Sequence, residues 1–410
     1  MQAYLVGGAV RDKLLGLKIK DHDWVVVGAT TDEMASLGYQ AVGKDFPVFL
    51  HPETKEEYAL ARTERKSGVG YKGFHVYAAP EVSLEDDLLR RDLTINAMAM
   101  DDQGNITDPF RGQADLENKV LRHVSPAFSE DPLRVLRVAR FAARFDHLGF
   151  NIAPDTLNLM TDLCVAGELQ HLVAERVWQE TWSALSEPNP EVYFETLRSC
   201  GALKILFPEI DALFGIPQVM TWHPEIDTGI HSLESLKQAC IKSPKADIRF
   251  ATLCHDLGKA TTDQAMLPKH HGHERRSYKL VKQLCKRLKV PNQPQKLAEV
   301  VAEFHTHCHQ LEQLKPSTIF KLLTSLSAFR SSQLLEDFVI CCEADFNGRS
   351  GWQRLDYPQR RGLLRIAHAA NQIDTQQIIG QGHSGAKIGE LIAGARIDAI
   401  KKEKMLWLQS

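Results

Sequence analysis

The sequence lacks a long apolar run, a cysteine framework and an excess of positive charge. Without about 18 consecutive apolar residues it has no candidate membrane-spanning helix, and its first residues have neither the basic nor the apolar segment of a secretory signal. None of the eight cysteines stands in a CxxC pair, so we expect reduced thiols and a cytoplasmic location. The net charge of -3 implies that any affinity for RNA depends on local basic surface.

Two segments are rich enough in cations to provide such a surface. The first contains Arg134, Arg137, Arg140 and Arg144, which recur at helical spacing. The second contains Arg275, Arg276, Lys279, Lys282, Lys286, Arg287 and Lys289 on one expected helix. A solvated helix face is the plain alternative for either segment.

The order of apolar and turn-forming residues predicts an α+β protein with an α/β head and a long all-α body. Strands are expected at residues 4–6, 24–27, 46–50 and 58–61, where short apolar runs end in turn residues. Glycine and serine in residues 67–73 indicate a mobile loop. From about Leu116 the pattern becomes helical and remains so almost to the end. Leu133, Leu136, Val138, Phe141 and Phe145 fit a buried stripe along a helix that begins at Pro132.

Acidic residues of the head stand in an arrangement that favours metal binding. Asp21 and Asp23 are two residues apart at a strand, so they share one face, and two such carboxylates repel each other without a cation. They suit Mg²⁺ ions that hold a triphosphate, and the Gly7-Gly8 turn upstream suits a phosphate cradle. Two exposed aspartates at a strand start are the plain alternative. Spacing alone does not choose between Glu56 and Glu57 as a third carboxylate.

A second constellation surrounds Pro132, which suits the first turn of a helix. Asp131 and Arg134 are three residues apart and project together. A carboxylate accepts from the exocyclic amine of cytosine or adenine, and a guanidinium donates to their ring acceptors. UTP and GTP would leave buried polar groups unpaired at such a pair. An ion-pair ladder on the helix surface is the alternative.

Taken together, these motifs resemble the class II tRNA nucleotidyltransferases and bacterial poly(A) polymerases of the polymerase-β-like superfamily. Further matches are the segment from Arg90 to Ala97, Glu130 to Arg134, and Glu175-Arg176, which in the family stabilises a neighbouring helix. The resemblance implies Asp21, Asp23 and Glu57 as catalytic residues. It assigns nucleotide binding to Gly8, Arg11, Arg91, Asp92, Asn96, Asp131, Arg134, Arg137 and Arg140.

Histidines and aspartates of the second half form another pattern, in which neutral imidazole and carboxylate ligands suit a divalent metal with an open water position. The order of these residues along the chain, a histidine, then an adjacent His-Asp pair, then an aspartate, resembles that of the HD phosphohydrolase superfamily. The resemblance implies that the metal ligands are His231, His255, Asp256 and Asp345. His271, His273 and His305 could complete a second metal site or bind phosphate. His305 and His309 share a helix face, but we expect His307 and His309 to be surface residues.

The combined resemblance implies a bifunctional enzyme that adds CCA to tRNA from CTP and ATP with Mg²⁺. Its HD domain would act as a 2′,3′-cyclic phosphodiesterase, 2′-nucleotidase and phosphatase, with Ni²⁺ favoured or Mg²⁺. The expected segments are a head at 1–115, a neck and body at 116–225, an HD domain at 226–346 and a helical tail at 347–410, in a monomer or homodimer.

Two other functions remain open on the residues alone. A poly(A) polymerase would have the same head, although the HD domain and the lack of an added basic tail argue against it. An HD nucleotide hydrolase with a regulatory head would not need both Asp21 and Asp23.

Overall fold

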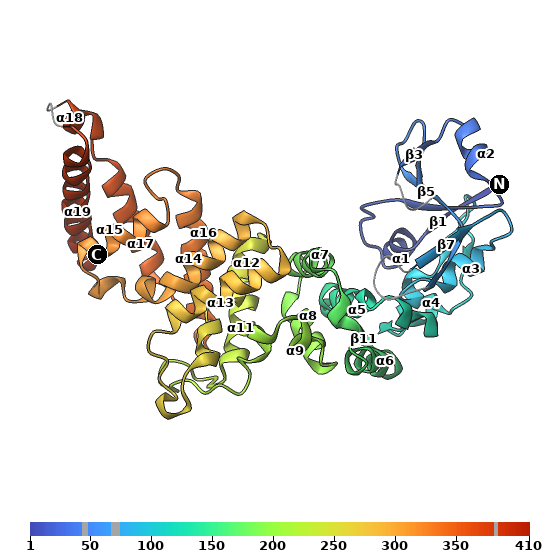
Figure 1. Ribbon diagram of the computed structural model, residues 1–410, viewed down its shortest axis with the longest axis horizontal. Coiled ribbons are helices and arrows are strands. Elements are labelled where there is room, and N and C mark those ends of the chain that lie inside the picture. The colour runs from blue at the N-terminus through green and yellow to red at the C-terminus, as the bar shows by residue number, and fades with distance from the viewer. Residues whose placement is uncertain (43–47, 67–73, 381–383) are drawn as a thin grey trace. The chain divides into compact units, whose positions relative to one another are not determined.

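A seven-stranded mixed sheet with strand order β3-β4-β5-β2-β1-β8-β9 forms the centre of the first of two units, Met1–Leu206 and Phe207–Ser410 (Figure 1). The computed structural model describes residues 1–42, 48–66, 74–380 and 384–410. The strands are β1 (Gln2–Val6), β2 (Asp23–Val27), β3 (Gln40–Val42), β4 (Val48–Leu50), β5 (Glu57–Leu60), β8 (Ala99–Met100) and β9 (Ile106–Thr107). β6 (Arg62–Lys66) and β7 (Phe74–Ala78) form a separate antiparallel pair.

Alternation along β2 gives the sheet two apolar faces. Val25 packs on one side with Leu88 and Ala97, and Val26 packs on the other with Met34 and Phe49. The helices of this part are α1 (Gly8–Leu14), α2 (Thr31–Ser36), α3 (Leu84–Leu89) and α4 (Gly112–Glu117). The predicted strands at residues 4–6, 24–27 and 58–61 are therefore confirmed, and β4 begins at Val48. The predicted loop at residues 67–73 lies outside the described residues.

The remainder of the first unit is helical apart from one short pairing. Its helices are α5 (Leu133–Phe145), α6 (Pro154–Val165), α7 (Ala174–Leu185), α8 (Pro190–Ser199) and α9 (Ala202–Leu206). β10 (Val120–Leu121) pairs in parallel with β11 (Asn151–Ile152), so the expectation of helix throughout from Leu116 is wrong at this point. Two residues per strand are too few to produce a visible alternation, which is why the sequence pattern missed them.

In its described residues the second unit contains helices and no named strand (Figure 1). They are α10 (Pro208–Asp211), α11 (Thr228–Lys242), α12 (Ala246–Leu253), α13 (His273–Leu288), α14 (Asn292–His309), α15 (Pro316–Ser325), α16 (Gln333–Asn347), α17 (Pro358–Asn371), α18 (Thr375–Ile379) and α19 (Ala386–Leu408). The α+β class with an all-α second part is confirmed. The finer division at residues 115, 225 and 346 stays a prediction. Among the described helices, none combines the length and apolarity needed to cross a membrane.

Candidate functional site

Asp21, Asp23 and Glu57 lie where the parallel strands β2 and β5 begin. The strand register pairs Asp23 with Glu57, and all three side chains are exposed. Partial burial raises the pKa of Asp23, Arg91 lowers it, and the neighbouring Asp21 raises it. Within the described chain, groups of three metal-ligating residues within 4.8 Å occur only in the second unit. The hard oxygen atoms of the three head carboxylates suit Mg²⁺.

The choice between Glu56 and Glu57 follows from the alternation of side chains. Trp24 stacks on Tyr58 with ring centroids 5.4 Å apart, and Trp24 Nε1 donates to Glu56 Oε2 at 3.1 Å. A second oxygen of Glu56 lies 3.2 Å from His22 Nδ1. Glu56 is therefore held on the side of Trp24, whereas the register aligns Glu57 with Asp23. Glu57 is the better candidate for the third carboxylate, and its role remains a prediction.

The Gly7-Gly8 turn brings backbone and guanidinium groups together at the start of α1. Gly7 has a φ of +66°, and a Cβ there would lie 2.8 Å from Arg91 Nη1. A Cβ on Gly8 would lie 3.3 Å from Arg11 Nη2. Arg91 is held by Asp87, whose Oδ2 accepts from Arg91 Nη2 at 3.1 Å. Because these two glycines have no Cβ, the guanidinium groups of Arg91 and Arg11 can lie close to the backbone, beside the strand that carries Asp23.

A chain of buried polar contacts joins the other predicted nucleotide-binding residues. Arg11 donates to Asp12 Oδ1 at 2.8 Å and to Asn96 Oδ1 at 2.5 Å. Asn96 Nδ2 and Arg137 Nε then donate to the two oxygens of Asp92 at 2.9 and 2.7 Å. Burial alone would raise the pKa of Asp92, but Arg137 and the hydrogen bond from Asn96 lower it well below its usual range. These contacts fix the side chains in place, and their contact with a nucleotide stays a prediction.

One face of helix α5 is buried, and the arginines of its other face form ion pairs with acidic residues. The predicted apolar stripe is confirmed, since Leu133, Leu136, Val138, Phe141 and Phe145 are all buried. Arg140 Nε contacts Glu180 at 2.7 Å, and Arg144 Nη2 contacts Asp12 at 2.8 Å. Arg137 already contacts Asp92. The arginines of α5 are therefore bound within their own unit, and they do not form a free basic surface.

The proposed base-selecting pair, Asp131 and Arg134, is anchored on both sides. Asp131 Oδ2 accepts from Arg176 Nη2 of α7 at 3.3 Å, which gives the Glu175-Arg176 motif a positioning contact. Arg134 donates to the backbone carbonyls of Ala127, at 2.9 Å, and of Arg90. The contact with Arg90 ties the start of α5 to the segment that contains Asp92. Both side chains are thus preorganised, as discrimination between bases requires.

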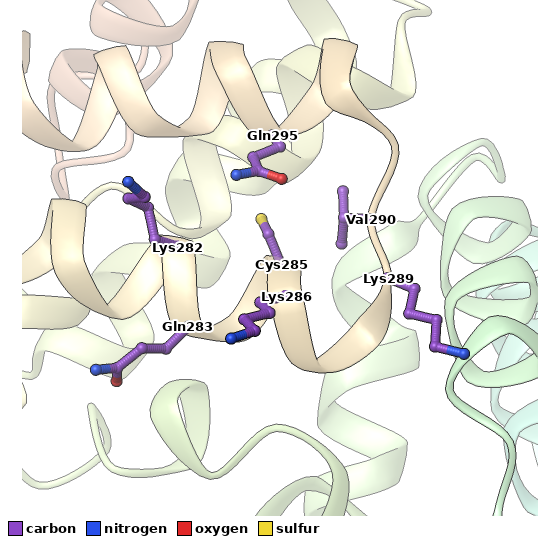
Figure 2. Close-up of a pocket in the computed structure, with 7 residues that line it drawn as sticks. All are labelled: Lys282, Gln283, Cys285, Lys286, Lys289, Val290 and Gln295. Carbon is purple, nitrogen blue, oxygen red and sulfur yellow. The ribbon is translucent and has the colours of Figure 1, made fainter.

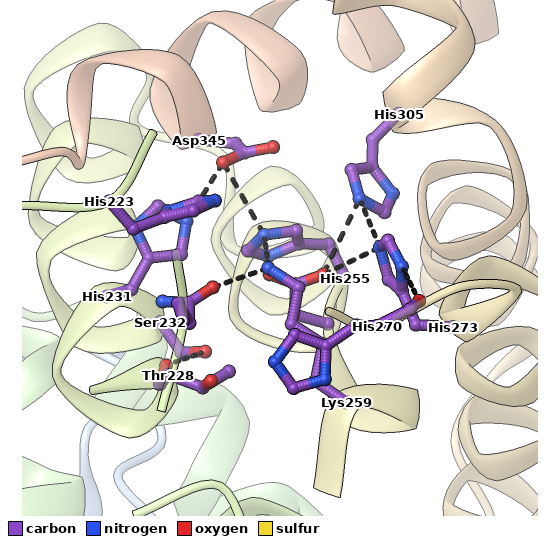
Figure 3. Close-up of polar contacts among 12 residues, drawn as sticks. His223, Thr228, His231, Ser232, His255, Lys259, His270, His273, His305 and Asp345 are labelled. Atoms are coloured by element: carbon purple, nitrogen blue, oxygen red, sulfur yellow. Dashed lines mark hydrogen bonds and ion pairs between the residues drawn. The ribbon is translucent and has the colours of Figure 1, made fainter. Parts of the chain in front are cut away.

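In the second unit, the four predicted HD ligands converge from three helical segments. Figure 3 labels His231, His255 and Asp345 among them. His231 lies on α11, His255 and Asp256 follow α12, and Asp345 lies on α16. His231 Nε2 is 3.0 Å from Asp345 Oδ1, and His255 Nε2 is 3.0 Å from Asp256 Oδ2 and 3.5 Å from Asp345 Oδ1. All four are buried. The structure therefore brings these four residues together, and their role as ligands stays a prediction.

Two further histidines, His273 and His305, complete the cluster. Their Nε2 atoms are 3.3 Å apart and lie 3.3 and 3.5 Å from Asp256 Oδ1. In His255, His273 and His305, Nδ1 lies 2.7 to 3.0 Å from a backbone carbonyl, which can only accept. Nδ1 therefore donates, and every Nε2 presents a lone pair to the cluster when the ring is neutral. His255 Nε2 and Asp256 Oδ1 are buried without a hydrogen-bond partner, so the donor set fits a divalent metal.

The charges of this cluster are strongly coupled. Burial lowers the pKa of His255, but Asp256 and Asp345 outweigh it and raise that pKa to about 10. Burial would raise the pKa of both aspartates, yet His255 and neighbouring cations lower it well below the usual range. Burial lowers the pKa of His305 to about 4. The negative charge that holds a proton on His255 is the charge that a metal cation would neutralise.

A cavity of about 660 Å³ opens beside the cluster and includes His273 in its wall. Its lining contains the cations Lys259, Lys269 and Arg349 and the aromatic rings of Trp222, Trp352 and Tyr357. Cations suit the phosphate of a nucleotide, and aromatic rings suit its base. The lining of the cavity therefore suits a phosphate ester beside His273.

The expectation that His309 is a surface residue is wrong. His309 Nε2 lies 2.7 Å from Asp345 Oδ2, and Tyr357 Oη lies 2.8 Å from His309 Nδ1. His307 faces the ring of Phe304 instead of the cluster. His271 lines the cavity but is in none of the groups of potential ligands found in the described chain.

Family comparisons match three successive parts of the chain. The poly A polymerase head domain matches residues 3–122, and the probable RNA and SrmB-binding site of polymerase A matches residues 149–214. The HD domain matches residues 228–328. The chain therefore carries the head domain of the poly A polymerase family, followed by the RNA-binding segment of that family and an HD domain. The motifs between Gly7 and Ala97 lie in the first of these segments and the clustered histidines in the third, whereas Asp131, Arg134 and Asp345 lie outside all three.

Solved structures of CCA-adding enzymes share the fold of this chain. The CCA-adding enzyme of Thermotoga maritima, complexed with tRNA_CCA, is 22% identical, with a TM-score of 0.63 over 100% of this chain and 91% of its own. The Bacillus stearothermophilus CCA-adding enzyme, in complex with CTP, is 22% identical, with a TM-score of 0.64 over 98% and 89%. A CCA-adding enzyme with ATP is 23% identical, with a TM-score of 0.65 over 97% and 87%.

Several residues of the nucleotidyltransferase and HD sites were missed by sequence reasoning. They are Asp87, Glu180, Glu225, Lys259 and Tyr357. Lys259 could have been found, because it lies three residues after Asp256, and its Nζ is 2.6 Å from Asp256 Oδ2. Glu225 Oε1 is 2.9 Å from His231 Nδ1, a contact for which the sequence offers no periodic signal.

Proposed function

We propose that this nucleotidyltransferase adds the 3′-terminal C, C and A of tRNA from CTP and ATP without a nucleic-acid template. The observation that carries the proposal is the register of Asp23 with Glu57, next to the glycine turn that admits Arg91. Carboxylates for metal and a cationic cradle for phosphate are the groups that nucleotidyl transfer requires. The solved structures with CTP, ATP and tRNA_CCA support the assignment through their shared fold.

In the proposed reaction, the 3′-hydroxyl of tRNA attacks the α-phosphorus of the nucleotide, and pyrophosphate leaves. Asp21 and Asp23 would hold Mg²⁺, and Glu57 would take part in accepting the hydroxyl proton. Bound Mg²⁺ neutralises charge on the triphosphate and activates the attacking hydroxyl. Gly8, Arg11 and Arg91 would orient the triphosphate, and Asp92 and Asn96 the sugar.

Choice of nucleotide would depend on Asp131 and Arg134. Asp131 accepts from the amine of cytosine or adenine, and Arg134 donates to their ring acceptors, with Arg137 and Arg140 further along α5. The contacts of Asp131 with Arg176 and of Arg134 with backbone carbonyls support this role, because they restrict both side chains. Asp131→Ala should therefore reduce the preference for CTP and ATP over UTP and GTP by a larger factor than it reduces CTP turnover.

We further propose that the HD domain hydrolyses phosphate esters of nucleotides as a 2′,3′-cyclic phosphodiesterase, 2′-nucleotidase and phosphatase. His231, His255, Asp256 and Asp345 would hold Ni²⁺ or Mg²⁺, and His273 and His305 could hold a second ion through Asp256. The metal supplies an activated water for attack on phosphorus. The cationic and aromatic lining of the adjacent cavity supports a nucleotide substrate.

The head is tested by incubating tRNA that lacks its last three nucleotides with Mg²⁺ and each nucleoside triphosphate, singly and together. The proposal predicts addition of C, C and A followed by a stop, loss of addition in Asp23→Asn, and retention in His255→Ala. Indefinite addition of A would favour a poly(A) polymerase, and no addition by the wild type would refute nucleotidyl transfer to this RNA.

The HD domain is tested with a 2′,3′-cyclic nucleotide in the presence of Ni²⁺ or Mg²⁺. His255→Ala should abolish hydrolysis, whereas Asp23→Asn should leave it intact because that residue belongs to the other site. Hydrolysis that survives His255→Ala, or none in the wild type with either metal, would contradict the assignment.

A further inference from the structure

An unpaired basic stripe runs along α13. Arg275, Lys279, Lys282 and Lys286 are spaced so that they share one helix face, and all four are exposed. None of them forms a hydrogen bond or an ion pair with another residue that the structure describes. Lys282 Nζ has one ring contact, 5.4 Å from the centroid of Tyr278. The four charges therefore face solvent without an acidic partner.

Other cations of the same helix are bound within the unit. Arg276 donates to the backbone carbonyl of His271 at 2.8 Å and to Thr262 Oγ1 at 2.9 Å. Arg287 Nη2 contacts Glu209 Oε2 at 2.7 Å. α13 thus separates its cations into inward ones, which have protein partners, and the outward stripe, which has none among the described residues. The arginines of α5 are paired in the same way as the inward set.

Of the four cations of the stripe, only Lys286, which lies in the last helical turn, is favoured by the helix dipole. Like charges three and four residues apart repel each other on a helix. Arg275 lies in the first helical turn, where the positive end of the helix dipole disfavours a cation. Beside the stripe, a hollow of about 580 Å³ is lined by Lys282, Lys286 and Lys289 (Figure 2). An external anion would offset the repulsion and has space to approach.

We propose that Arg275, Lys279, Lys282 and Lys286 bind the phosphate backbone of the RNA substrate. The inference rests on the proposed function, because the tRNA substrate is a polyanion. It extends the RNA-binding surface of the protein to the HD domain. The stripe is about 16 Å long, at 1.5 Å per helical residue, enough to follow several phosphates of one strand. Lysine binds phosphate as a point charge, so this contact carries affinity and no sequence preference.

The test compares two triple variants in the full chain. One removes the stripe through Lys279→Gln, Lys282→Gln and Lys286→Gln. The matched control removes three exposed lysines of the same unit, which have no ion pair among the described residues, through Lys321→Gln, Lys401→Gln and Lys402→Gln. Fluorescence anisotropy measures Kd for tRNA lacking CCA from about 50 to 200 mM salt. A third variant, with Lys279→Arg, Lys282→Arg and Lys286→Arg, retains the positive charge of the stripe.

The proposal predicts weaker binding by the stripe variant, with the slope of log Kd against log salt reduced by about 2 to 3. The control and the arginine variant should keep the wild-type slope. Equal weakening in stripe variant and control, or an unchanged slope in the stripe variant, overturns the proposal. If the wild type adds CCA while the stripe variant binds tRNA as tightly, only this inference fails. If the wild type binds no tRNA, the proposed function fails with it.

Discussion

Arg137 Nε lies 2.7 Å from Asp92 Oδ2, although the two residues are 45 positions apart. The contact links helix α5, where base selection is proposed, to the segment proposed to hold the sugar. Asp92 is buried, and its second oxygen accepts from Asn96. The pair therefore connects stability of the first unit to the geometry of its nucleotide site.

Asp92→Asn should destabilise the first unit by about 2 kcal/mol. Removal of one member of a buried pair costs about 3–5 kcal/mol, and this value is reduced because Arg137 reaches solvent. Urea unfolding at neutral pH measures the change. Asp102→Asn, at an exposed position, is the control and should have almost no effect. Equal unfolding free energies in the two variants would contradict the importance of the pair.

The same residue predicts how stability depends on pH. The pKa of Asp92 is lowered in the folded state, so its contribution is fully present above its ordinary pKa of about 4. That contribution is lost as the pH falls through the folded-state pKa. The difference in unfolding free energy between wild type and Asp92→Asn should be constant from pH 7 to about 5 and shrink in more acidic solution. If this difference in unfolding free energy grew as the pH falls, the prediction would be contradicted.

Gly7→Ala should impair nucleotide binding more than it impairs folding. Gly7 and Gly16 have φ values of +66° and +67°, so alanine strains the backbone at both, and the ψ of −128° at Gly7 adds strain there because that conformation favours glycine. Only at Gly7 would the new Cβ meet Arg91 Nη1, at 2.8 Å, whereas nothing lies within 4 Å at Gly16. We expect kcat/KM for CTP to fall by about 10- to 100-fold in Gly7→Ala alone. Similar kinetics in both variants would argue against the cradle.

Tyr357→Phe should weaken metal binding in the second unit. Tyr357 contacts His309, which contacts the predicted ligand Asp345, so the change releases His309, the outer partner of a ligand. Loss of such a partner typically costs about 10- to 100-fold in metal affinity. Isothermal titration with Ni²⁺ measures the affinity, and Tyr278→Phe on α13 provides the control. If the metal affinity of Tyr357→Phe were unchanged, Tyr357 would have only a packing role and would not support the metal ligands.

Local patterns predicted the parts of the sites that lie close together in the sequence. Alternation placed Asp23 on a strand, helical spacing identified the buried stripe of α5, and the adjacent His255-Asp256 pair indicated a metal site. The basic segments could be recognised but not interpreted, because spacing does not reveal that Arg140 faces Glu180 while Lys282 faces solvent.

Contacts between distant elements could not be predicted in this way. His309 was expected at the surface because its partner Asp345 comes from another helix, 36 residues away. Tyr357 follows the segment that matches the HD domain, in a region that carried no motif. Burial of these groups is decided by packing among α14, α16 and α17, and the periodicity of one helix contains no information about its neighbours.

Binding of Mn²⁺ at the head tests the central claim most directly. Electron paramagnetic resonance would count bound Mn²⁺ with a non-hydrolysable CTP analogue, in a His231→Ala, His255→Ala background that removes two of the predicted HD ligands. The account predicts a pair of nucleotide-dependent ions that is lost when Asp21→Asn and Asp23→Asn are added. Undiminished Mn²⁺ binding in that variant would contradict the assignment of these carboxylates to the metal site.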